Sequence, residues 1–134
     1  MNLNILPLRY KGKRLNELAE KIIKVFPNIN NYVINDDLNF IDSILNYDKN
    51  SDHPQEYIEN YKLLDFLSSL KYERPILGVS SLLTIGKRYD LPLYGSGREI
   101  DKCAFVSLYR QEFGILDSDI HIERLSIESL HELG

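Results

Sequence analysis

The segment 15–26 carries its apolar residues at the spacing of one helix face, and this pattern constrains the fold more than any other. These apolar positions are Leu15, Leu18, Ala19, Ile22, Ile23 and Phe26. They follow the spacing of an amphipathic helix, and Pro27 ends it because proline cannot continue the hydrogen-bond pattern. The apolar runs on either side, 3–8 and 30–40, are strand-like, and Pro7 is predicted to mark the edge or end of the first strand. A strand, a helix and a strand in this order favour an α/β fold.

The rest of the chain continues this alternation of strands and helices. The strand at 30–40 has a polar break at 35–37, residues 46–54 are loop-like, and Pro54 suits the first position of a helix over 57–70. Residues 74–85 are typical of a largely buried strand, and 89–97 of a turn-rich connection with room for a short edge strand, in which Gly95 and Gly97 are turn residues. Residues 103–110 predict another strand, and the last helix begins near Asp117 or Ser118. We therefore expect a single domain over residues 1–134, with a twisted mixed sheet of about four to five strands.

The charge balance and the single cysteine argue against several classes of protein. The 16 Lys and Arg and the 20 Asp and Glu residues are interspersed and give a net charge of −4, so we expect no nucleic-acid and no membrane partner. The longest apolar stretch, 76–85, is far shorter than the ~20 residues that span a bilayer. Cys103 cannot form an intramolecular disulfide and is predicted to be a small buried residue. No signal sequence is visible, so a cytoplasmic location is the simplest expectation.

The final segment, "SIESLHELG", places a His-Glu pair near the end of an amphipathic helix. At about 100° per residue from Ile122, the apolar side is predicted to hold Leu125, Ile127, Leu130 and Leu133. The opposite side is predicted to hold Arg124, Glu128, His131 and Glu132.

A residue 135 would lie on the face of His131 one turn later, which is the geometry of the zinc motif H-E-x-x-H. In that motif two imidazoles bind one zinc, and the glutamate lies beside the metal-bound water. The same letters also suit an ordinary helix that ends at a glycine cap, and the pair alone does not decide between the two.

Longer segments carry a family resemblance: 76–85 (ILGVSSLLTI), 90–113 (DLPLYGSGREIDKCAFVSLYRQEF) and 120–134 (IHIERLSIESLHELG). Together they resemble the archaemetzincins, zinc-dependent metallopeptidases of the metzincin group. The matching motifs are Gly78-Val79, Tyr94-Gly95, Val106 to Arg110, Glu123-Arg124 and His131 to Gly134. Residues 1–70 are similar, less specifically, to the family's opening strand, helix, strand and helix.

The resemblance implies a fold, a reaction and roles for individual residues. The fold would be a metzincin-like N-terminal subdomain that ends in the zinc-site helix. His131 would be the first ligand of a catalytic zinc, and Glu132 the general acid/base that activates the zinc-bound water to hydrolyse a peptide. A strand beside the cleft, where an extended peptide substrate could add to a sheet edge, would contain Val106, Ser107, Leu108 and Tyr109. A second, structural zinc is implied only for a full-length parent.

The chain departs from the family pattern at its end. It stops where residue 135 would be the second histidine, so the other zinc ligands and the family's cysteines are missing. Since catalytic zinc sites use three protein ligands, we expect a truncated chain that is inactive as given, with exposed apolar surface that favours self-association. Ser129 stands where the family prefers alanine. The alternative is a small non-catalytic α/β binding or interaction domain in which Gly134 is a true helix cap.

Overall fold

The structure is a computed structural model that describes residues 2–10, 13–36, 39–48, 55–86, 95–107 and 119–133. The described residues form helices and strands that build two sheets. In chain order these elements are β1 (Asn2–Leu8), α1 (Leu15–Ile23), β2 (Asn31–Ile34), the 3-10 helix η1 (Asn39–Ile44), β3 (Asn46–Asp48), β4 (Gln55–Glu59), α2 (Asn60–Ser69), β5 (Ile76–Ser80), β6 (Leu83–Ile85), β7 (Gly95–Arg98), β8 (Cys103–Ser107) and α3 (Asp119–Leu133).

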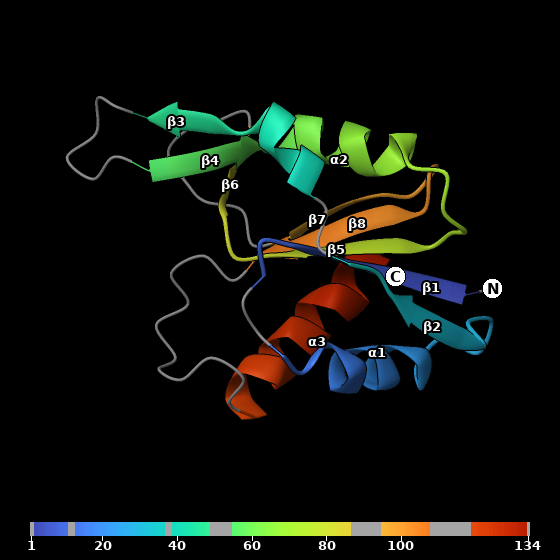
Figure 1. The fold of residues 1–134 in the computed structure, drawn as a ribbon. Helices are drawn as coiled ribbons and strands as arrows, with labels where there is room; N and C mark the ends of the chain where they lie inside the picture. The colour runs from blue at the N-terminus through green and yellow to red at the C-terminus, as the bar shows by residue number, and fades with distance from the viewer. Residues whose placement is uncertain are drawn as a thin grey trace.

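The larger sheet has five strands in the order β2-β1-β5-β8-β7, and the smaller has three in the order β3-β4-β6. In the larger sheet β2, β1, β5 and β8 run parallel, whereas β7 pairs with β8 in the antiparallel sense. Helices α1 and α3 lie on one face of this sheet and α2 lies on the other (Figure 1). The predicted α/β class with a mixed sheet is confirmed.

Apolar layers cover both faces of the larger sheet, because successive side chains of a strand point to opposite faces. The layer on the side of α1 and α3 includes Ile5, Leu18, Val79, Val106 and Leu125. The layer on the side of α2 includes Leu6, Leu8, Leu63, Leu67 and Phe105. Burial on both faces explains why the inner strands read as nearly continuous apolar runs in the sequence.

Pro7 is the last residue but one of β1, so the prediction that it marks the end of a strand holds to within one residue, although β1 is an inner strand rather than an edge strand. The carbonyl oxygen of Ile5 faces β2, since it accepts a hydrogen bond from the amide of Asn35 at 2.9 Å. The backbone nitrogen of Pro7, two residues later, points to the same side of β1. The pairing with β2 ends where Ile5 meets Ile34, so the N–H that proline lacks would have had no partner strand. An interior strand therefore tolerates this proline.

The second helix begins later than predicted. The sequence predicts a helix over 57–70, whereas residues 55–59 form β4 and α2 begins at Asn60. The pair Tyr57-Ile58 fits either pattern, and the pairing of Ile58 with Thr84 of β6 decides for the strand. β3 pairs with β4 and occupies part of the predicted loop over 46–54, while Pro54 lies outside the described residues.

The predicted single strand over 74–85 is wrong, because β5 and β6 belong to different sheets. Two serine side chains fix the bend between them. The amide of Leu82 donates to Oγ of Ser80 at 3.0 Å, and the hydroxyl of Ser107 donates to the carbonyl oxygen of Leu82 at 2.6 Å. The chain thereby leaves the larger sheet and joins the smaller one.

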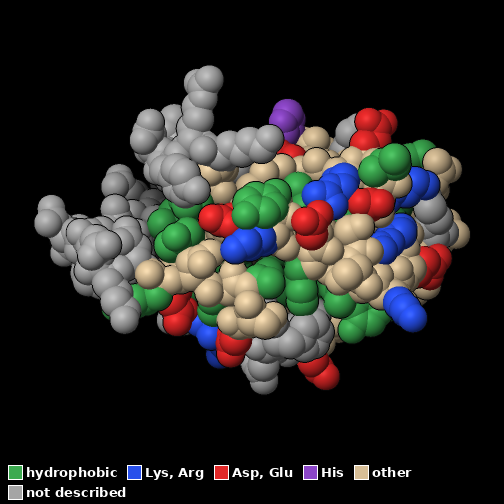
Figure 2. Space-filling model, turned by 90° about the horizontal axis from the view of Figure 1, so that it is seen from above, with side chains coloured by type: hydrophobic (Ala, Val, Ile, Leu, Met, Phe, Trp, Pro, Cys, Tyr) green, Lys and Arg blue, Asp and Glu red, His purple; other side chains and the backbone are tan. Residues whose placement is uncertain are grey.

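The surface over α2 mixes acidic, basic and apolar side chains, as Figure 2 shows for this face of the molecule. Among the helices that the structure describes, none has the length and hydrophobicity needed to cross a membrane.

Candidate functional site

A narrow buried face holds α3 against the sheet and α1. Ile122, Leu125, Ser126 and Ser129 are at most 5% exposed. Ile127, predicted to lie in the core, is 57% exposed, since it lies about 140° round the helix from Ile122. The buried arc of α3 therefore ends before it reaches Ile127, and it is narrower than the sequence predicts.

Glu132 lies at the opposite border of the same arc, about 20° from Leu125. Its side chain is 15% exposed, whereas that of His131 is 78% exposed. The sequence predicts both residues on the polar side, so the prediction is right for His131 and wrong for Glu132. The cause is the strand beneath the helix. A Cβ added to Gly95 would lie 3.0 Å from Cγ of Glu132, and one added to Gly97 would lie 2.7 Å from the carbonyl oxygen of Glu132.

The local electrostatics favour the neutral form of Glu132. Burial raises its pKa above the usual value for glutamate, Glu128 raises it further, and His131 lowers it. The imidazole Nε2 of His131 lies 3.8 Å from the nearer carboxylate oxygen of Glu132. An exposed imidazole and a largely buried carboxylate therefore lie side by side at the end of α3.

These residues fit one position of a catalytic zinc site. His131 offers an exposed nitrogen donor, which is a common zinc ligand. Nowhere in the part of the chain that the structure describes do three or more His, Cys, Asp and Glu side chains gather closely enough to hold a metal. A catalytic zinc needs three protein ligands, so the described residues offer one candidate ligand and an adjacent carboxylate rather than a whole site.

The described part of the predicted substrate-binding strand is an inner strand of the larger sheet. Val106 and Ser107 lie on β8, which is buried and paired with β5 on one side and β7 on the other. Leu108 and Tyr109 lie outside the described residues. An added peptide needs unpaired backbone groups, and within the described residues the outer side of β7 has them. The open edge beside α3 is thus β7, and a substrate-binding role for Val106 to Tyr109 stays a prediction.

Sequence reasoning missed β7 as part of the site. The sequence predicts Gly95 and Gly97 as turn residues in a connection with room for a short edge strand, whereas both glycines lie inside that strand, β7. The signal that could have identified the strand is the spacing of the two glycines. Residues two apart share one face of a strand, so this face of β7 carries no side chains.

A cavity of about 440 Å³ opens beside the end of α3. The residues around it include Phe26, Ile29, Pro75, Cys103, Glu132 and Leu133. Cys103 is 2% exposed, and burial raises the pKa of its thiol, so the thiol stays protonated. The prediction that Cys103 is a small buried residue is confirmed.

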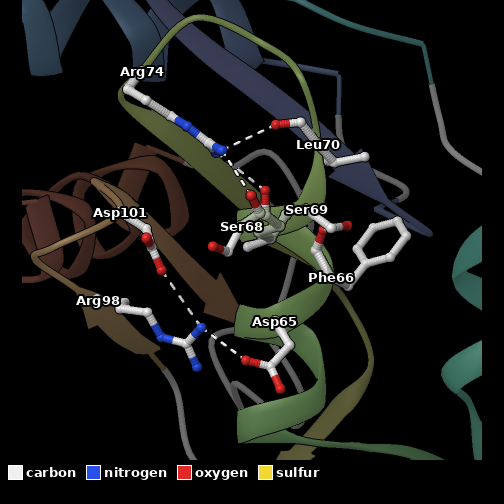
Figure 3. Close-up of polar contacts among 9 residues, drawn as sticks. Asp65, Phe66, Ser68, Ser69, Leu70, Arg74, Arg98 and Asp101 are labelled. Carbon is white, nitrogen blue, oxygen red and sulfur yellow. Dashed lines mark hydrogen bonds and ion pairs between the residues drawn. The ribbon is translucent and has the colours of Figure 1, made fainter.

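Two arginines fix the elements on the other face of β7 (Figure 3). Arg98, on β7, pairs with Asp65 of α2 at 2.8 Å and with Asp101 at 3.6 Å. Arg74 donates to three main-chain carbonyl oxygens at the end of α2, those of Leu67, Ser68 and Leu70, at 3.1, 2.7 and 3.0 Å. These contacts connect the outer strand to α2 and complete the C-terminus of that helix.

Comparison with known proteins gives matches in structure alone. No known family matches the sequence, and no curated protein does. The crystal structure of archaemetzincin from Archaeoglobus fulgidus, complexed with malonate, matches with a TM-score of 0.74 and 20% identity, covering 99% of this chain and 75% of that one. Archaemetzincin from Methanopyrus kandleri matches with a TM-score of 0.69 and 20% identity, covering 99% of this chain and 71% of that one.

A zinc-dependent peptidase from Methanocorpusculum labreanum matches with a TM-score of 0.72 and 16% identity, covering 98% of this chain and 78% of the peptidase. At such identities the likeness concerns the fold, and it extends over almost all of this chain. The chain therefore has the fold of archaemetzincins, with α3 as its last described element.

Proposed function

We propose that this chain carries part of the catalytic centre of an archaemetzincin-type zinc metallopeptidase, with His131 as a zinc ligand and Glu132 as the general base. The observation that supports the proposal is the place of Glu132 within an archaemetzincin fold. Its carboxylate, with a raised pKa, lies between an exposed imidazole and the strand with the open edge. A general base is most effective when its pKa lies near the working pH, and burial moves Glu132 in that direction.

Each of these groups has a separate task. Zinc, when bound, would lower the pKa of a water molecule towards ~7 and polarise the peptide carbonyl. His131 would donate one nitrogen to the metal, and Glu132 would accept the proton of the attacking water and pass it to the leaving amine. The N–H and C=O groups on the outer side of β7, which pair with no other described strand, would hold an extended peptide by strand addition. The remaining zinc ligands have to come from outside the described residues.

The test of the base uses the complete product of the reading frame that encodes this chain, purified with zinc. Glu132→Gln keeps the size of the side chain and removes its basicity, and Glu128→Gln, one turn earlier on α3, is the matched control. We expect Glu132→Gln to lower peptide hydrolysis by about 100-fold or more with unchanged zinc content, and Glu128→Gln to keep most activity. Full hydrolysis by Glu132→Gln would refute the assigned role.

The test of the ligand measures zinc rather than turnover. His131→Ala should lower the zinc content of the same protein, because one of three donors is lost. Sequencing past the codon for Gly134 adds an independent check, since the motif requires a histidine codon at 135. A stop codon there, with zinc content unaffected by His131→Ala, would favour the non-catalytic binding domain instead.

A further inference from the structure

Two glycines of β7 contact the last turn of α3 so closely that no other residue would fit without a shift. A Cβ at Gly97 would lie 2.7 Å from the carbonyl oxygen of Glu132, which is a main-chain atom and cannot rotate away. A Cβ at Gly95 would lie 3.0 Å from Cγ and 3.4 Å from Cδ of Glu132, and 3.3 Å from the carbonyl oxygen of Phe105. Carbon atoms in ordinary van der Waals contact lie about 3.5 Å or more apart.

Backbone conformation does not require glycine at either place. Neither residue has the positive φ that other residues rarely adopt. Both belong to a regular strand, with Gly95 opposite Val106 and Gly97 opposite Ala104. Alanine would normally be favoured over glycine in such a strand, because it restricts the unfolded chain. The need for glycine is therefore steric, and the nearest atoms belong to Glu132 at both positions, with the carbonyl oxygen of Phe105 as a further contact at Gly95.

We propose that Gly95 and Gly97 are positioning residues that seat the His131–Glu132 turn directly on the strand with the open edge. The Glu132 side chain extends along the bare face of β7, with Cγ and Cδ over Gly95 and a carboxylate oxygen 3.5 Å from the Cβ position of Gly97. A peptide strand added to β7 would then have this carboxylate as its neighbour on the α3 side, in place of a β7 side chain. The catalytic role of this arrangement rests on the proposed function. The close contact between Glu132 and the two glycines does not depend on it.

The glycines differ in what they contact, and a double-mutant cycle can separate them. Gly95→Ala meets the side chain of Glu132, so Glu132→Ala should remove the conflict. Gly97→Ala meets the main chain of Glu132, so Glu132→Ala should not relieve it. Gly78→Ala on β5 is the matched control, because its Cβ would lie 2.9 Å from Cδ1 of Leu8, on the other face of the sheet.

The experiment measures urea unfolding of the 134-residue chain in both backgrounds. We expect Gly95→Ala to lose at least half of its destabilising effect when Glu132→Ala is present, and Gly97→Ala and Gly78→Ala to have the same effect in either background. If Gly95→Ala alone does not fold, recovery of folding in the double variant gives the same result. An unchanged effect of Gly95→Ala in the two backgrounds would overturn the proposal.

A spectroscopic readout distinguishes positioning from general stability. At one fixed pH, the side-chain ¹³C signals of Glu132 should shift in Gly95→Ala and in Gly97→Ala and should not shift in Gly78→Ala, even where the loss of stability is equal. Unmoved Glu132 signals in the β7 variants would refute the seating. Neither measurement involves zinc or hydrolysis, so failure here and failure of the proposed peptidase function are separate results.

Discussion

Ser129 offers the sharpest stability test, because its hydroxyl is buried and has no hydrogen-bond partner among the described residues. The residue is 0% exposed on the face of α3 that packs against the sheet, and no donor or acceptor in the described part of the chain lies at bonding distance from its Oγ. A hydroxyl in this position has lost its water without replacement, which costs about 1 to 3 kcal/mol. Ser129→Ala removes only the oxygen, so it should increase stability.

The size of the gain follows from two contributions. Removal of the unpaired hydroxyl recovers part of its desolvation cost, and alanine is a better helix former than serine by about 0.5 kcal/mol. We expect Ser129→Ala to raise the free energy of unfolding by about 1 to 2 kcal/mol. For a domain of this size that corresponds to an increase in Tm of about 3 to 8 °C.

Ser126→Ala is the matched control, since Ser126 lies three residues earlier on the same buried face and is 5% exposed. The Ser126 hydroxyl is not both buried and unpaired. Its substitution should therefore raise the free energy of unfolding by at most the helix-propensity difference of about 0.5 kcal/mol. Urea unfolding followed by circular dichroism suits a chain without tryptophan. Equal effects of the two substitutions would refute the reasoning, and would indicate that the Ser129 hydroxyl bonds the carbonyl of Leu125 in solution.

Three further predictions concern Glu132 and the two arginines. Because burial raises the pKa of Glu132, the stability linked to its neutral form is full below the ordinary glutamate pKa of 4.5 and is lost as pH rises through the raised value. Glu132→Gln should therefore be more stable than the natural chain at pH 7, and urea unfolding at pH 4 should show a smaller difference or none. Arg74→Met should lower stability by about 2 to 3 kcal/mol, because three carbonyl oxygens lose a charged donor, as unfolding would measure. Arg98→Met should lower stability only slightly, because its ion pair with Asp65 is partly exposed, and added salt should reduce even that loss.

The elements that depend on local pattern alone were predictable from the sequence. The stripe that begins at Leu15 forms α1, and the run around Val106 forms an inner strand, because each pattern is long or apolar enough to decide its own structure. The boundary between β4 and α2 was not predictable in this way. Ile58 becomes a strand residue through its pairing with Thr84, 26 residues later, and that pairing is a tertiary contact.

The sequence identifies the two candidate residues, His131 and Glu132, but it does not predict how deeply Glu132 is buried. The letters of the last helix identify His131 and Glu132 as a candidate pair, and helical spacing correctly leaves His131 exposed. The same spacing places Glu132 on the polar side, because a helical projection considers one helix in isolation. Whether a residue at the border of the buried arc is covered depends on the neighbouring element, and here that element is a strand whose face towards α3 carries only glycines.

Small residues on both partners lead us to expect that this end of α3 is sensitive to volume. The helix contributes Ser126 and Ser129 to its buried face, and β7 presents Gly95 and Gly97 to Glu132. Such residues bury little apolar area, so the hydrophobic effect holds this turn less strongly than it holds a leucine-lined helix. We expect the close approach of β7 to this turn to compensate through van der Waals contacts, which fall off steeply with distance. We therefore expect one added methyl group at Gly97 to move the turn that carries His131 and Glu132, whereas one at Gly78 would displace leucine side chains on the other face of the sheet and leave that turn in place.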